Sequence, residues 1–188
     1  MSVLKKDLRK SLLSIRKSMS NDYKIWADRA IQSKLYPLFM DGSYRHIGFY
    51  FPILGEPDLL PMASVLSKSV LTILLPHTNE DDSICFCQWC GDGSFARGRY
   101  FIPEPKFQGI IVETVHAVVV PMLGWTRSGY RVGYGKGCFD RFFSTHANEN
   151  IFKVGVSYSS LAIDKNFEED HDLPMNIIVT EKDVITCQ

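Results

Sequence analysis

We expect the chain to be organised around residues 121–141, which read Pro121-Met-Leu-Gly-Trp-Thr-Arg-Ser-Gly-Tyr-Arg-Val-Gly-Tyr-Gly-Lys-Gly-Cys-Phe-Asp-Arg141. The preceding run Ala117-Val118-Val119-Val120 is short, apolar and stopped by proline, which predicts a buried strand that runs into a loop. The loop holds glycines at 129, 133, 135 and 137, and such a segment can turn its backbone N–H groups inward around an anion. Arg131, Lys136 and Arg141 add positive charge, so phosphate is the expected ligand.

Two familiar phosphate loops do not match this segment. A Walker A loop needs Gly-x-x-x-x-Gly-Lys-Ser/Thr, but Tyr130 and Gly137 stand at the first glycine and at the hydroxyl. A Rossmann fingerprint needs a third glycine where this chain has Cys138. A flexible surface turn is the alternative from turn chemistry alone. Asp140, directly after the glycines, favours the phosphate site because an acid in that place could hold Mg²⁺.

The loop from Gly129 to Arg141 resembles the signature of the 5-formyltetrahydrofolate cyclo-ligase (methenyltetrahydrofolate synthetase) family, which runs approximately G-x-R-L-G-x-G-x-G-Y-Y-D-R. Members of this family convert 5-formyltetrahydrofolate to 5,10-methenyltetrahydrofolate with hydrolysis of ATP and a requirement for Mg²⁺. The resemblance therefore implies the same reaction here, with ADP and phosphate released.

The N-terminal segment is expected to form a basic amphipathic helix from Lys5 to Lys17. Its apolar stripe would be Leu4, Leu8, Leu12 and Ile15 at helical spacing. Lys5 and Arg9, at i and i+4, can grip one anion together, although a solvated basic face is the alternative. The family begins with a K-x-x-x-R element whose basic residues contact the ATP phosphates and the folate, and Lys5 to Arg9 resembles it.

Two further segments resemble family elements. Glu56-Pro-Asp58-Leu59 matches the pattern E-x-D-T except at its last position, which implies that Glu56 contacts the folate, with Phe51 among the pocket walls. A helix cap or a solvated turn residue is the alternative for this glutamate. Phe101-Ile-Pro103-Glu104-Pro105 resembles G-I-x-E-P, which implies a position near the nucleotide pocket, or else a rigid connector.

From the resemblance we expect the following site. The catalytic residues would be Arg131 and Lys136. The folate would contact Arg9, Phe51, Glu56, Tyr134, Gly135, Gly137 and Cys138. ATP would contact Lys5, Lys6, Arg9, Arg131, Gly133, Tyr134, Gly135, Lys136, Gly137 and Phe139. Asp140 and, less directly, Asp172 would hold Mg²⁺.

Three positions depart from the family pattern. Cys138 stands where the family usually has the first tyrosine of Y-Y-D, an aromatic ring that can stack on the pterin. Trp125-Thr126 replaces the common F-D, and Asn176 stands where some members carry a second metal-binding aspartate. These departures motivate two alternatives, a folate- or nucleotide-binding homologue with weakened turnover and an ATP-dependent ligase that acts on another substrate.

The cysteines of the middle segment suggest a second kind of site. Cys85, Cys87 and Cys90, with His77 as a possible fourth ligand, could indicate zinc, but zinc pairs are commonly spaced C-x₂-C. The period-2 alternation of an ordinary strand explains Cys85 and Cys87 equally well.

Length and composition limit the remaining choices. The 188 residues suit one domain, and 21 Lys and Arg balance 21 Asp and Glu, so no overall field attracts nucleic acid or an anionic membrane. No segment approaches the ~18 apolar residues of a membrane span, the N-terminus lacks the apolar centre of a signal peptide, and five cysteines suit a reducing compartment. We expect a cytosolic monomer or weak homodimer whose partners are a folate and ATP.

The fold class expected is α/β, a three-layer sandwich with a largely parallel sheet, helices on both faces and ligands at the carboxyl ends of the strands. Further helices are expected at 22–39, where Trp26, Ala30 and Leu35 would face inward, and at 62–68 and 138–146. Further strands are expected at 47–51, 70–76, 84–90, 152–158 and 176–181.

Overall fold

A computed structural model describes residues 3–91, 95–105, 114–145, 151–164, 167–169 and 172–187. Its centre is a seven-stranded sheet in the order β11-β10-β9-β6-β1-β2-β3. The inner neighbours pair in parallel, whereas the edge strands β3 and β11 are antiparallel. The strands are β1 (His46–Gly48), β2 (Thr72–Thr78), β3 (Ile84–Gln88), β6 (Ala117–Pro121), β9 (Phe152–Val156), β10 (Ile177–Val179) and β11 (Val184–Thr186).

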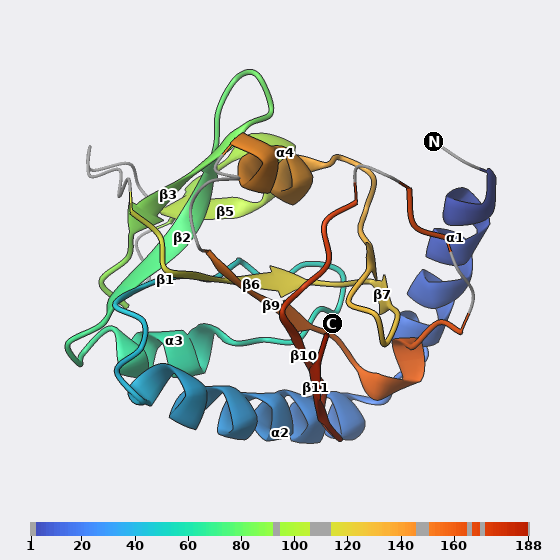
Figure 1. Cartoon of the computed structure of the whole chain (residues 1–188), viewed down its shortest axis with the longest axis horizontal. Helices are drawn as coiled ribbons and strands as arrows, with labels where there is room; N and C mark the ends of the chain where they lie inside the picture. The colour runs from blue at the N-terminus through green and yellow to red at the C-terminus, as the bar shows by residue number, and fades with distance from the viewer. Residues whose placement is uncertain are drawn as a thin grey trace.

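Helices cover both faces of this sheet, as expected. Figure 1 shows α2 (Asn21–Met40) and α3 (Leu60–Leu66) below it, α4 (Cys138–Thr145) above it, and α1 (Val3–Lys17) at one end. Two small antiparallel ladders are added, β4 (Phe95–Arg97) with β5 (Pro103–Pro105) and β7 (Gly124–Trp125) with β8 (Arg131–Val132). Short 3-10 turns lie at η1 (Arg99–Phe101) and η2 (Ser159–Leu161). The α/β sandwich with a largely parallel sheet is therefore confirmed.

The buried strand predicted before the glycine loop is β6, the middle strand of the sheet. Ala117, Val118, Val119 and Val120 are fully buried, because a parallel strand with helices on both faces needs apolar side chains on each. Other strands have different limits from those expected. The strand expected at 47–51 ends at Gly48, and the one expected from Val70 begins at Thr72, since Val70 is 90% exposed.

Helix α2 begins where the sequence predicts, with Ser20 as its cap accepting a hydrogen bond from the backbone N–H of Tyr23. The predicted inward face is partly wrong. Trp26 is 52% exposed and Ala30 is only half-buried, whereas Leu35 is buried as expected. The buried stripe runs one residue later, through Ala27, Ile31, Leu35 and Phe39, at the i, i+4 spacing that keeps side chains on one helix face.

The inward face predicted for helix α1 is partly wrong, because Leu12 is buried and Leu8 packs against the core as expected, but Ile15 does not. Ile15 is 40% exposed, whereas Arg16 and Lys5 are buried beside Leu12; the side chain of Leu4 lies outside the described set. Helix α1 contacts β8 and η2, and its inward side chains include the core residue Leu12 as well as cations that meet polar groups of the glycine loop. Cationic side chains are buried there because partners are present for them.

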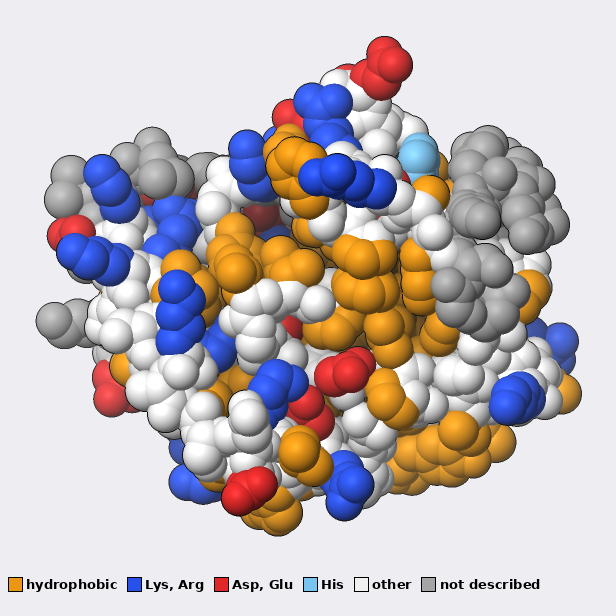
Figure 2. All heavy atoms as spheres, turned by 180° about the vertical axis from the view of Figure 1, so that it is seen from behind, with side chains coloured by type: hydrophobic (Ala, Val, Ile, Leu, Met, Phe, Trp, Pro, Cys, Tyr) orange, Lys and Arg blue, Asp and Glu red, His pale blue; other side chains and the backbone are white. Residues whose placement is uncertain are grey.

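The face seen from behind has a hollow in its middle, where hydrophobic side chains gather and Lys and Arg side chains lie around it (Figure 2). In the described part of the chain, no helix is long and apolar enough to cross a membrane.

Candidate active site

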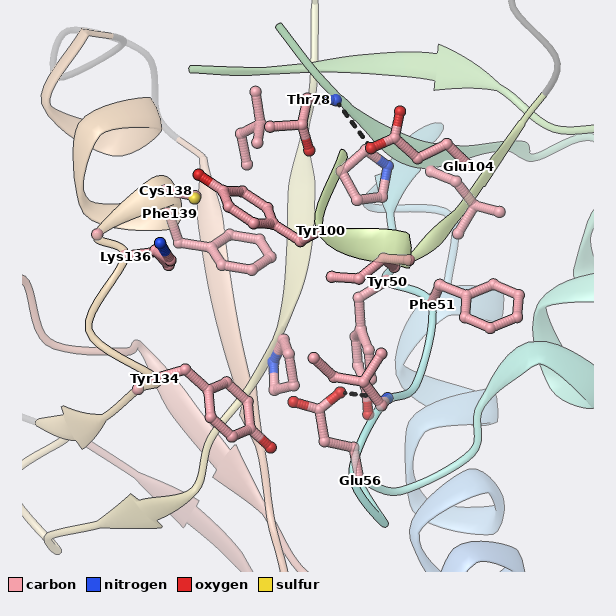
Figure 3. Close-up of a pocket in the computed structure, with 18 of the residues that line it drawn as sticks. Tyr50, Phe51, Glu56, Thr78, Tyr100, Glu104, Tyr134, Lys136, Cys138 and Phe139 are labelled. Carbon is pink, nitrogen blue, oxygen red and sulfur yellow. Dashed lines mark hydrogen bonds between the residues drawn. The ribbon is translucent and has the colours of Figure 1, made fainter. Parts of the chain in front are cut away.

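A cavity of about 290 Å³ lies beyond the carboxyl ends of β1, β2 and β6. Its walls come from the segment after β1, the end of β2, the region of η1 and β5, and the glycine loop between β8 and α4 (Figure 3). This is where ligands bind in open α/β sheets. Residues expected at the site that do line it are Phe51, Glu56, Arg131, Gly133, Tyr134, Gly135, Lys136, Gly137, Cys138, Phe139 and Asp140.

Glu56 is the buried acid of this cavity, with only 2% of its surface exposed. Its Oε2 accepts a hydrogen bond from the backbone N–H of Ile53 at 2.9 Å, and its own N–H donates to the Ile53 carbonyl at 2.9 Å. Burial raises its pKa from an ordinary 4.5 to about 7, while the N–H of Ile53, the charge of Arg16 and the hydroxyl of Tyr134 act in the opposite direction. The carboxyl group is thus poised between its two protonation states near neutral pH.

The glycine loop takes a shape that needs its glycines. Gly135 and Gly137 have φ values of +92° and +64°, a region that side chains with a Cβ rarely occupy. The loop leads into α4, which begins at Cys138, so the loop lies at a helix N-terminus as predicted. Tyr134 points toward Glu56 across the cavity (Figure 3). The loop therefore faces the buried acid from the opposite wall.

Arg131 and Asp140 are ion-paired within the cavity wall, and Arg131 Nη1 also donates to the Leu173 carbonyl at 3.1 Å. Lys136 Nζ lies 4.7 Å from the centre of the Tyr100 ring, and Tyr100 lines the same cavity. The cations expected to be catalytic therefore both stand at the wall of the cavity.

The predicted residues of α1 and Asp172 do not line the cavity but support the loop around it. Lys5 Nζ is 2.7 Å from Asp172 Oδ2 and 3.4 Å from Glu169 Oε2, and Arg9 Nε donates to the Gly133 carbonyl at 2.7 Å. Lys6 is exposed. Helix α1 thus reaches the glycine loop through Arg9 and the acidic segment through Lys5.

Arg16 is a residue that the sequence reasoning missed. It is buried, and its Nη1 donates to the Tyr134 hydroxyl at 2.7 Å while its Nη2 donates to the Met122 carbonyl at 2.6 Å. The signal was present, because Arg16 follows Lys5 by eleven residues and Arg9 by seven, spacings that return to one helix face. Arg16 was missed because Ile15 was assigned to the inward face of the helix.

Tyr50 and Glu104 also line the cavity. Tyr50 is buried and its hydroxyl donates to the Pro57 carbonyl at 2.6 Å. Glu104, in the Glu-Pro segment, accepts a hydrogen bond from the Thr78 N–H at 3.3 Å and lies 2.8 Å from His77 Nδ1. This segment therefore lines the cavity, and its place beside a nucleotide stays a prediction.

An exposed cluster joins the β2–β3 hairpin to η1 and α4 beside Tyr100. The carboxylate of Asp82 accepts hydrogen bonds from the Tyr100 hydroxyl and pairs with Arg99, and its backbone carbonyl accepts one from Arg141 Nη2 at 2.7 Å. Asp82 and Tyr100 both have positive φ. We call Asp82, Arg99, Tyr100 and Arg141 the clasp.

The described residues contain no group of three or more His, Cys, Asp or Glu side chains arranged to hold a metal ion. Cys85 and Cys87 lie on β3 and the exposed Cys90 follows it, while His77, the possible fourth zinc ligand, pairs with Glu104. Asp140 pairs with Arg131, and Asp172 pairs with Lys5. A carboxylate at this place can still serve Mg²⁺ together with nucleotide oxygens, since Mg²⁺ in such sites takes one or two carboxylates plus phosphate.

The sequence model of the 5-formyltetrahydrofolate cyclo-ligase family matches residues 1–181. The chain belongs to this family. A 5-formyltetrahydrofolate cyclo-ligase of Mycolicibacterium smegmatis is 27% identical over 185 residues, which cover 95% of this chain and 94% of the relative. One of Haemophilus influenzae is 20% identical over 176 residues, which cover 91% and 94%.

Two solved structures share the fold of this chain. The NMR structure of Aquifex aeolicus 5,10-methenyltetrahydrofolate synthetase is similar with a TM-score of 0.86 and 29% identity, covering 99% of this chain and 94% of that one. A 5,10-methenyltetrahydrofolate synthetase of Mycoplasma pneumoniae has a TM-score of 0.74 at 22% identity, covering 94% and 98%, and shares the fold.

Of the three departures from the cyclo-ligase signature, Cys138 alone lines the cavity. Burial raises the pKa of its thiol. Thr126 is buried, and its Oγ1 accepts a hydrogen bond from the Tyr130 N–H at 3.2 Å. Asn176 Oδ1 accepts one from the Lys153 N–H at 2.7 Å and so links β10 to β9. Thr126 and Asn176 thus accept hydrogen bonds from backbone N–H groups, and Cys138 is the departure that changes the lining of the cavity.

Proposed function

We propose that this protein converts 5-formyltetrahydrofolate to 5,10-methenyltetrahydrofolate in the cytosol, using ATP and Mg²⁺ and releasing ADP and phosphate. The family membership supports the reaction class. The observation that carries the proposal is the shared cavity, in which the buried Glu56 faces a cationic glycine loop. A folate ring and a triphosphate must meet in this reaction. The wall with Glu56 suits the folate ring, and the wall with the glycine loop suits the triphosphate.

The glycine loop would hold the triphosphate. Gly133, Gly135 and Gly137 leave the backbone open to oxygen atoms, and Lys136 and Arg131 supply fixed positive charge. Lys5 and Arg9 would contribute from α1, where carboxylate oxygens of Asp172 and Glu169 now lie against Lys5 and phosphate oxygens would replace them. Lys6, on the exposed side of α1, would add charge near the entrance.

The carboxylate of Asp140 would help to hold Mg²⁺, with Asp172 as a second oxygen source. The ion would neutralise charge on the transferring phosphate oxygens. Arg131 holds Asp140 at the cavity wall, so this pair places an oxygen ligand beside the loop that would bind the nucleotide.

Glu56 would orient the folate. A carboxylate accepts hydrogen bonds from ring N–H groups, and such donors favour its charged form. Phe51, Tyr134 and Phe139 would form aromatic walls around the pterin, and Cys138 would leave more room there than the usual tyrosine.

The chemistry asks the protein for alignment and charge rather than for covalent participation. The formyl oxygen attacks the γ-phosphate of ATP and expels ADP; N10 then attacks the activated carbon, which expels phosphate, and the N10 proton is lost to solvent. Phosphoryl transfer depends on positioning and on neutralising charge at the oxygens. Lys136 and Arg131 would neutralise the charge on the oxygens, and the two opposed walls of the cavity would position the ligands.

The test is to mix the protein with 5-formyltetrahydrofolate, ATP and Mg²⁺ and to follow the absorbance of the methenyl product. We expect product only when ATP and Mg²⁺ are both present. A lack of ATP-dependent product would refute the proposal.

Cys138 favours one alternative, a homologue that binds both ligands but turns over weakly. Calorimetry would then show binding of folate and ATP without product, and Cys138→Tyr would restore turnover. If instead ADP were released without folate, a ligase for another substrate would be indicated.

A further inference from the structure

We infer that Arg16 is a positioning residue of the folate site, which fixes the Tyr134 hydroxyl against Glu56 from beneath the cavity. This inference rests on the proposed function, in which Glu56 orients the folate. It concerns a residue outside the glycine signature and outside the K-x-x-x-R element.

The guanidinium of Arg16 links a rigid part of the fold to a less regular one. Its Nη2 donates at 2.6 Å to the carbonyl of Met122, which directly follows β6 and also accepts a hydrogen bond from the Ser157 hydroxyl at 3.0 Å. Its Nη1 donates at 2.7 Å to Tyr134, in the glycine loop. The position of Tyr134 is thereby tied to the end of the central strand.

The hydrogen bonds have a fixed direction. Arginine can only donate, so the Tyr134 oxygen accepts from Arg16 and keeps its own proton for another acceptor. Glu56 is the acceptor that we infer, because the Tyr134 side chain points toward its carboxyl group across the cavity (Figure 3) and interacts with it electrostatically. Donation by a phenol stabilises the carboxylate form of Glu56, which is the form that accepts hydrogen bonds from a pterin ring.

Arg16 differs from an ordinary structural arginine. It forms no ion pair within 4.0 Å with a carboxylate of the described residues, and its Nε is buried without a hydrogen-bond partner among them. Leaving a buried donor unpaired lowers stability. Its carbon atoms pack 3.6 Å from where a side chain on Gly55 would begin, so the residue lies directly behind the Glu56 turn.

The groups that face Glu56 come from four elements. Arg16 lies on α1 and Lys24 on α2, Tyr134 lies on the glycine loop, and Tyr50, whose own pKa burial and Glu56 raise, follows β1. Lys24 is already paired with Asp28 at 2.5 Å. Arg16 is therefore the cation whose charge is most available to Glu56.

The test measures Glu56 directly by ¹³C NMR titration of the ligand-free protein, with Glu56→Gln to assign its signal. We expect Arg16→Met to raise the pKa of Glu56 by about one unit, and Arg16→Lys, which keeps the charge, to restore part of the difference. Lys17→Met is the matched control, because it removes the same charge one residue along the helix from an exposed position and should leave the titration unchanged.

Steady-state kinetics supply a second readout. Arg16→Met should raise the KM for folate about tenfold with a smaller change in kcat and in the KM for ATP, since it disturbs binding at one wall. If Arg16→Met does not fold, Tyr134→Phe interrupts the same link without removing the arginine and should also raise the pKa of Glu56.

An unchanged Glu56 titration in folded Arg16→Met, or in Tyr134→Phe where the first variant is unfolded, would overturn the inference. The titration needs no turnover. A wild-type protein that makes no methenyl product would therefore refute the proposed function while the role of Arg16 was still decided by NMR.

Discussion

Glu56→Gln should stabilise the fold at alkaline pH while it removes folate activity. Burial holds the pKa of Glu56 at about 7 instead of 4.5, and each unit of difference corresponds to about 1.36 kcal/mol. Well below pH 4.5 the carboxyl group is neutral in both the folded and the unfolded chain, so its ionisation does not affect the free energy of unfolding. As the pH rises from 4.5 to 7, the unfolded chain ionises first, so the folded state loses roughly 3 kcal/mol of relative stability.

Glutamine removes this loss because it has no charge at any pH, and its amide oxygen can still accept the hydrogen bond from Ile53. Urea unfolding at pH 8 should therefore show Glu56→Gln to be roughly 3 kcal/mol more stable than the wild type, and the difference should vanish near pH 4. The matched control is Glu80→Gln, an exposed glutamate of the β2–β3 hairpin, for which no such difference is expected. The reasoning would be refuted if Glu56→Gln were less stable than the wild type at pH 8. It would also be refuted if the two proteins differed in free energy of unfolding by the same amount at pH 8 and pH 4.

Three further substitutions test other parts of the site. Lys136→Ala should lower kcat about a hundredfold in steady-state assays, because a fixed charge at the transferring phosphate is lost. Asp82→Ala should raise the KM for folate by freeing Tyr100 from the clasp, with a smaller change in the urea midpoint because Asp82 is only half-buried. Gly129→Ala should destabilise the fold by about 2 kcal/mol in urea, since Gly129 has a φ of +95° and a Cβ there would lie 2.9 Å from the Met175 carbonyl.

Each of these has a clear contrary result. Unaltered turnover in Lys136→Ala would remove that lysine from the phosphate site. A lowered urea midpoint with an unchanged KM in Asp82→Ala would make the clasp structural only. Gly129→Ala with wild-type stability would mean that the loop can shift away from Met175, and Gly42→Ala offers a comparison, because Gly42 has a φ of +87° but open space around it.

The strongest predictions from sequence were local ones. The run Ala117 to Val120 is apolar at every position, so any parallel sheet would bury it on both faces, and the structure does so. The glycine loop was predictable for a similar reason, because the spacing of its glycines and cations is contained within one short segment. Glu56 was found through its resemblance to a family element, whereas its burial could not be foreseen.

Helix faces were harder because they depend on distant partners. In α2, the stripes that include Trp26 and Ala27 differ by one residue, and both hold apolar side chains, so periodicity alone does not choose between them. In the folded chain Ala27 is fully buried and Trp26 is 52% exposed, so the stripe through Ala27 is the inward one. In α1, the inward face carries Lys5 and Arg16, and only the folded chain shows which oxygens meet them.

The three inward cations of α1 suggest why this helix is basic on its buried side. Lys5 contacts the acidic segment at Asp172, Arg9 contacts the backbone of the glycine loop, and Arg16 contacts Tyr134. They are spread along eleven residues, roughly 16 Å of helix at 1.5 Å per residue. Helix α1 is a rigid rod of that length, and it contacts the site at both the expected phosphate end and the expected folate end. It therefore sets the distance between the two ligands. Because the proposed reaction joins an oxygen of one ligand to the phosphorus of the other, that distance decides whether bound ligands can react.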